Sequence, residues 1–145
     1  MSERELETMI RDAVKLHGHL GPFLVIGVRM GTIANRILTP AHNGSDALQV
    51  TVRVPLRTPY SCVLDGLQST TKCTIGNQWL KVEDSPEEIT AEFKMQGSEK
   101  ALKISTSPKI IAEIENEFSR GTTSEELAAK IASAREDQLF ELERQ

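Results

Sequence analysis

The chain has 145 residues, of which 39% are hydrophobic, 26% charged and 4% aromatic, a profile typical of one folded globular domain rather than of a disordered chain. Its 17 basic and 21 acidic residues give a formal net charge of −4, which argues against nucleic acid as a partner because phosphate binding needs a basic surface. No apolar run approaches the roughly 18 residues that a membrane span needs, and the polar N-terminus is unlike a signal peptide. We therefore expect one cytoplasmic domain over residues 1–145, with no membrane partner.

The first predicted element is an amphipathic helix that ends at His17. Its apolar residues recur at the three- and four-residue spacing of a single helix face. They are Leu6, Met9, Ile10, Ala13 and Val14. His17 continues this stripe and Gly18 interrupts it, so we expect the helix to end there.

A second helix is predicted over residues 22–38, because Pro22 suits a first helical turn and the segment behind it is apolar on nearly all sides. We expect this helix to lie buried at the centre of the fold. Gly27 and Gly31 leave one side of it without side chains. Such a smooth side favours the close approach of another helix or of a sheet.

The middle of the chain holds one predicted strand, one short helix and both cysteines. A loop over residues 39–46, in which His42 is expected to be exposed, precedes an alternating pattern at 48–54 that predicts a half-buried strand. Two prolines end this strand, and a short helix is predicted over residues 61–70. An irregular stretch through Cys73 follows.

A β-hairpin is predicted in the second half of the chain. Alternating apolar residues at 89–95 and 102–104 flank a Gly-Ser turn at 97–98. A two-residue turn places Phe93 opposite Leu102 and pairs an acid with a base at the neighbouring position.

Two further helices are predicted after the hairpin. A Ser-Pro pair at 107–108 begins the first, and Gly121 ends it. Thr123 and Glu126 form a capping box that begins the second, and residues 136–145 are too charged for any assignment. This order of elements predicts an α+β domain in which an antiparallel sheet packs against helices.

Two of the three histidines lie in the segment His17-Gly18-His19-Leu20-Gly21-Pro22. A histidine on an apolar stripe is typically a hydrogen-bonded core residue, and this is the alternative interpretation of His17. His19 lies beyond the helix end between two glycines, which favours a functional role. The free backbone N–H groups at the start of the next helix also favour an anion or an ionised ligand nearby.

Cys62 and Cys73 are too few for a disulfide scaffold, and a reducing compartment keeps thiols for burial, metal binding or catalysis. In an unbroken helix they would lie about 16 Å apart, so both can join one site only if the helix breaks between them. Cys62 is the better ligand candidate, because Asp65 shares its helix face and can serve as a further ligand, as a hydrogen-bond partner of a ligand or as a general base. The alternative for each cysteine is a small buried apolar residue. Imidazole and thiolate together suit zinc or a similar divalent ion.

These motifs resemble the family named after the E component of formylmethanofuran dehydrogenase. The resemblance rests on the histidine segment, on the apolar helix that ends in Val28-Arg29-Met30-Gly31, and on Cys62-x-x-Asp65-x-x-Gln68 followed by Cys73-Thr74-x-Gly76-Asn77. It implies an α+β core domain that forms an intertwined homodimer, with a metal or active site built from the histidine and cysteine motifs. It also implies a link to one-carbon metabolism and methanogenesis.

The chain departs from the family pattern at two positions. Members usually carry Cys where this chain has Gly21, and Gly where it has Phe23. Without that thiol, His17, His19 and Cys62 are the main ligand candidates, and thiol-dependent chemistry is less expected. Some relatives add a C-terminal zinc finger, whereas this chain has no later cysteine pair, so we expect a member that consists of the core domain alone.

Our first hypothesis is a metal-binding protein in which His17, His19 and Cys62 hold a divalent ion, expected to be zinc. Asp65 and Cys73 are then the candidate catalytic residues, and an open fourth position on the metal would take water or a small ligand. The second hypothesis is a non-catalytic small-molecule-binding protein or an accessory subunit of an oxidoreductase. The third gives these residues a role in folding alone.

Overall fold

The computed structural model describes residues 2–39 and 47–145. The predicted loop over residues 40–46, with the exposed position expected for His42, lies outside the described residues. The elements are α1 (Glu3–His17), α2 (Pro22–Leu38), β1 (Leu48–Val54), α3 (Cys62–Thr71), β2 (Leu80–Asp84), β3 (Thr90–Met95), β4 (Ala101–Thr106), α4 (Pro108–Ser119), α5 (Ser124–Ser133), α6 (Glu136–Leu139) and β5 (Phe140–Arg144). This content confirms the predicted α+β class. No helix in the described ranges is both long enough and apolar enough to cross a membrane.

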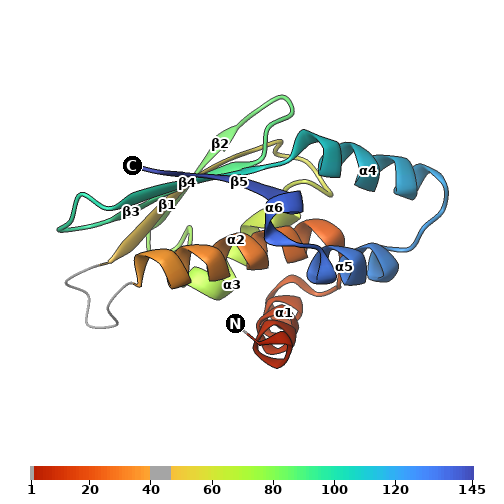
Figure 1. Cartoon of the computed structure of the whole chain (residues 1–145), viewed down its shortest axis with the longest axis horizontal. Helices are drawn as coiled ribbons and strands as arrows, with labels where there is room; N and C mark the ends of the chain where they lie inside the picture. The colour runs from red at the N-terminus through yellow and green to blue at the C-terminus, as the bar shows by residue number, and fades with distance from the viewer. Residues whose placement is uncertain (1, 40–46) are drawn as a thin grey trace.

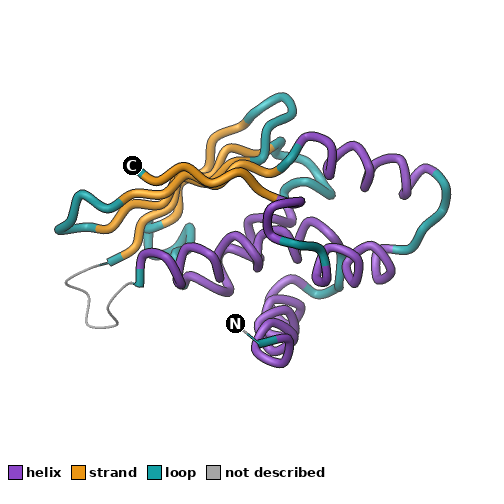
Figure 2. The backbone as a smooth tube through the Cα atoms, viewed as in Figure 1, coloured by secondary structure: helices purple, strands orange, loops and turns teal. Residues whose placement is uncertain are grey.

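The strands form one sheet in the order β2-β1-β3-β4-β5 (Figures 1 and 2). Three of its strand pairs are antiparallel, but β1 and β2 are parallel. The expectation of a purely antiparallel sheet is therefore corrected to a mixed sheet. The physical reason is the connection between these two strands: a parallel pair needs a crossover, and α3 lies within the segment that supplies it.

The hairpin formed by β3 and β4 has the predicted register. Phe93 pairs with Leu102, and the neighbouring acid Glu92 pairs with Lys103. Sequence patterning did not identify β5, which pairs antiparallel with β4. Only its apolar Phe140 and Leu142 alternate with charged residues, so the strand carries a short signal within a highly charged segment.

Helices α2 and α3 cover one face of the sheet (Figure 1). The inward positions of β1 are apolar and buried, and α2 is buried along most of its length, as the sequence predicts. A second, smaller cluster joins α1 to α2 through Ala13, Leu24 and Val28. The end of α1 is therefore held against the helical layer, where α2 and α3 meet.

The contact between α2 and α3 depends on glycine. A Cβ added at Gly27 would lie 2.1 Å from the carbonyl oxygen of Val63, and one added at Gly66 would lie 2.3 Å from that of Leu24. The two backbones thus approach more closely than any side chain would permit, which agrees with the smooth side predicted for α2. This close approach brings the first turn of α3 next to the loop between α1 and α2.

Candidate metal centre

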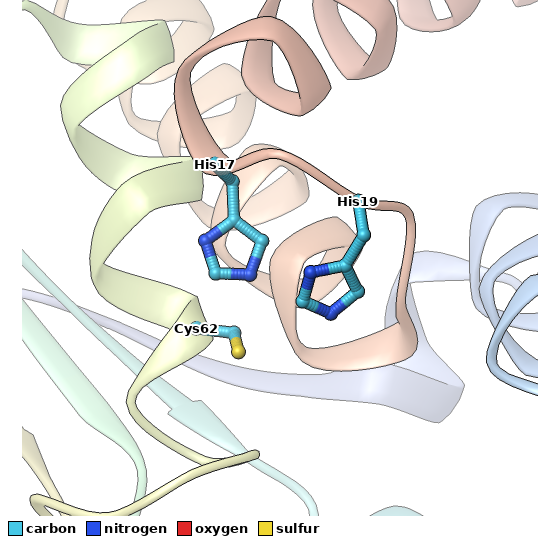
Figure 3. A group of neighbouring side chains, drawn as sticks. All are labelled: His17, His19 and Cys62. Atoms are coloured by element: carbon cyan, nitrogen blue, oxygen red, sulfur yellow. The ribbon is translucent and has the colours of Figure 1, made fainter.

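Three donor side chains meet where α1, α2 and α3 come together. His17 is the last residue of α1, His19 lies in the loop before α2, and Cys62 is the first residue of α3. One ligand atom from each residue lies within 4.8 Å of the others. Figure 3 shows both imidazole rings and the thiol directed toward a common space. The structure thus brings together the three residues that the sequence analysis selected as metal ligands.

The backbone at Gly18 places the two histidines side by side. Its φ of 105° is in the left-handed region, which glycine adopts readily, and its N–H bonds to the Val14 carbonyl over 2.7 Å and ends α1. The chain then turns, so that the rings of His17 and His19 lie with their centroids 4.6 Å apart and their planes inclined by 39°. A helix that continued would have carried His19 to a different face.

The thiol of Cys62 is buried, with 8% of the residue exposed. Burial raises the pKa of this thiol, and the negative charge of Asp65 raises it further. The metal-free thiol therefore holds its proton at neutral pH. Since the thiolate is the form that binds metal, ion binding must release this proton.

Asp65 determines which nitrogen of His17 faces the site. Its Oδ2 lies 2.7 Å from His17 Nδ1. The other ring nitrogen, Nε2, is buried and has no hydrogen-bond partner in the described part of the chain. A buried polar atom without a partner is costly, and a metal ion would satisfy it. The donor set, two imidazoles and a thiol, therefore fits a borderline-soft divalent ion such as zinc.

Cys73 lies outside this group of three. Helix α3 ends at Thr71 and Lys72 adopts a left-handed conformation, so the helix does break between the two cysteines. The break directs the buried Cys73 thiol toward β1, where its Sγ donates to the Leu48 carbonyl over 3.1 Å. Burial raises the pKa of this thiol as well. These contacts favour a packing role for Cys73, and its catalytic role stays a prediction.

Gly21 leaves free space beside His19. A Cβ added there would lie 3.4 Å from Ser124 Oγ and 3.9 Å from His19 Nε2, which are ordinary contact distances. Sequence analysis did not identify Ser124, because it lies in α5, far from the histidine segment along the chain. Its approach to the site depends on the packing of α5 against α2.

A family model described as "FmdE, Molybdenum formylmethanofuran dehydrogenase operon" matches residues 16–144. The chain therefore belongs to this family, as the motifs predicted. The match includes the three donor residues, Asp65 and the whole sheet.

Two similar proteins extend this comparison. A protein of Archaeoglobus fulgidus described as "Probable S-adenosyl-L-methionine-binding protein" is 34% identical over 83 residues, which cover 54% of this chain and 21% of the relative. The chain thus spans about a fifth of the length of this curated relative. A solved structure of an FmdE-like protein of tungsten formylmethanofuran dehydrogenase, from Syntrophus aciditrophicus, has a TM-score of 0.64, covers 96% of this chain and 71% of that chain, and is 20% identical. It shares the fold.

Proposed function

We propose that this protein binds a divalent metal ion, zinc, through His17, His19 and Cys62. The observation that carries this proposal is the convergence of these donors within 4.8 Å of one another around the buried, unpartnered Nε2 of His17. Structural zinc sites have four protein ligands, whereas catalytic sites have three and keep one position open. A set of three therefore favours a site that takes an exogenous ligand.

A bound divalent ion with an open position would supply Lewis acidity to an oxygen atom of a small substrate. The residues of the chain prepare the site for this. Asp65 holds His17 by its Nδ1 atom, so of the three roles considered for this carboxylate the geometry favours orientation of a ligand. Family membership supports a further proposal, that the site serves one-carbon redox chemistry in the cytoplasm.

Metal analysis of the purified protein tests the proposal. We expect about one zinc per chain by plasma mass spectrometry and loss of the ion in His19→Ala and in Cys62→Ser. Two matched controls are His42→Ala, at the third histidine, and Cys73→Ala, at the second cysteine; both are expected to retain the metal. A wild-type protein that remains metal-free after zinc is supplied would contradict the proposal.

The second candidate is a small-molecule-binding or accessory protein without catalysis. A groove of about 960 Å³ lies between α4 and the loop before α3 and includes Arg57, Tyr60 and Glu115. Tyr60 donates a hydrogen bond to Glu115 and packs edge-on against Phe23, at the start of α2. The description of the Archaeoglobus fulgidus relative makes S-adenosyl-L-methionine the first compound to test. Saturable binding by calorimetry that Tyr60→Ala abolishes would favour this candidate, and absence of heat would count against it.

A further inference from the structure

A chain of hydrogen bonds runs from the loop after α3 to the candidate metal centre. The backbone N–H of Ile75 donates to Gln68 Oε1 over 3.1 Å, and Gln68 Nε2 donates to Asp65 Oδ1 over 3.0 Å. The other carboxylate oxygen, Oδ2, lies 2.7 Å from His17 Nδ1. Three consecutive hydrogen bonds thus connect a loop outside the centre to an imidazole inside it.

The direction of this chain is determined at the loop. A backbone N–H can only donate, so Gln68 must present its carbonyl oxygen to Ile75 and its NH₂ group to Asp65. A carboxylate can only accept, so Nδ1 of His17 must carry the proton. The neutral ring then holds its lone pair on Nε2, the buried atom beside the other two donors. Each contact leaves the next one a single arrangement.

The loop that begins this chain is held in place by its own hydrogen bonds. Asn77 Oδ1 accepts from the backbone N–H groups of Thr74 and Trp79 over 2.9 Å and 3.0 Å. Cys73 attaches the start of the loop to a carbonyl of β1. The N–H of Ile75 therefore has a defined position, and Gln68 transmits that position to the carboxylate.

We propose that Gln68 is a positioning residue for the metal centre. It aims Asp65 so that His17 already presents an unprotonated Nε2 before an ion binds. The proposal rests on the proposed function in assigning His17 as a ligand, although the state of the metal-free ring can be observed by itself. Hydrogen-bond partners outside the ligand set typically contribute 10- to 100-fold to metal affinity, and a group one bond further out belongs at the lower end of that range.

Two measurements test Gln68. In the metal-free protein at mildly alkaline pH, long-range proton–nitrogen NMR spectra of the wild type are expected to show His17 with its proton on Nδ1. In Gln68→Leu we expect a mixture of the two tautomers, together with zinc affinity lowered by about tenfold in competition with a chromogenic chelator. Gln68→Glu has nearly the same size and still accepts from Ile75 but cannot donate to Asp65, so it isolates the second hydrogen bond. Gln96→Leu, at an exposed turn position, is the matched control and should resemble the wild type.

The two readouts separate this proposal from the metal-binding proposal. A tautomer change in both Gln68 variants supports the positioning role even if the wild type binds no zinc, in which case only the proposed function fails. Wild-type tautomer and wild-type affinity in both folded variants would overturn the positioning role. A wild-type ring that carries its proton on Nε2 would overturn it as well.

Discussion

The imidazole of His17 shows how a single residue combines two of the interpretations that its sequence position allowed. It lies on the buried side of α1 and is hydrogen-bonded to Asp65, as a core histidine would be. The same hydrogen bond leaves Nε2 directed at a second histidine and a thiol. The sequence predicted these partners by residue type and spacing, including Asp65 on the face of Cys62. It could not predict which ring nitrogen each partner contacts, because that depends on how α1 and α3 pack.

Replacement of Asp65 tests its hold on His17. Asp65→Ala is expected to lower zinc affinity by about 10- to 100-fold, because His17 loses the partner that fixes its tautomer and ring orientation. The circular dichroism spectrum should not change, since the Asp65 side chain is 35% exposed. Asp12→Ala, an exposed substitution on α1, is the matched control. Equal affinities in the two variants would be incompatible with the orienting role.

The buried thiol of Cys62 makes metal binding dependent on pH. Its pKa is raised by burial and by Asp65, so below that pKa each bound ion must displace a proton. Zinc affinity should therefore rise with pH, by about tenfold per unit while the thiol is protonated, and level off once it ionises. Calorimetry in buffers of different ionisation enthalpy measures the released proton. Cys62→Ser should remove this slope, and a slope that persists would show that another group supplies the proton.

The free space at Gly21 predicts a gain of function. A side chain there would extend from a Cβ 3.9 Å from His19 Nε2 without a steric clash, so Gly21→Cys adds a thiol beside the three existing donors. We expect tighter zinc binding than in the wild type, because a fourth protein ligand closes the open position. Gly21→Ser, of similar size but with a poorer ligand for zinc, is the control. Weaker binding in the folded cysteine variant would show that the space does not face the metal.

At the scale of elements, the crossing of α2 and α3 positions Cys62 and Asp65 relative to the two histidines. Gly27 and Gly31 predicted a close approach, but the sequence did not identify the partner or the matching Gly66 on α3. Nonlocal contacts account for the other omissions as well. Strand β2 has few apolar residues and joins the sheet through a parallel pairing with β1 that no local pattern specifies.

Gly27→Ala is expected to destabilise the protein strongly. The added methyl group would lie 2.1 Å from a backbone carbonyl oxygen of α3, so the helices must separate, at a cost of about 1–3 kcal/mol or more. Urea unfolding measures this cost. Gly76→Ala, where the nearest atom would be 3.8 Å away, is the control and should unfold close to the wild-type midpoint. A stable Gly27→Ala variant would contradict the close packing of the two helices.

At the scale of the whole molecule, we propose that the chain forms a homodimer, as the family resemblance implies. Sedimentation equilibrium should then give twice the 16.1 kDa mass of one chain. A mass of one chain across the micromolar concentration range would contradict this proposal. The fold class, the hairpin register and the buried α2 could be predicted from local periodicity, whereas assembly depends on surface complementarity that no periodic pattern encodes.

The coordination shell of the bound ion tests the central claim most directly. X-ray absorption spectroscopy of the zinc-loaded protein should show one sulfur at about 2.3 Å and two imidazole nitrogens at about 2.0 Å, with a light atom completing the shell. In Cys62→Ser the sulfur contribution should disappear. A shell of oxygen atoms alone, or one with two sulfurs, would contradict a centre built from His17, His19 and Cys62.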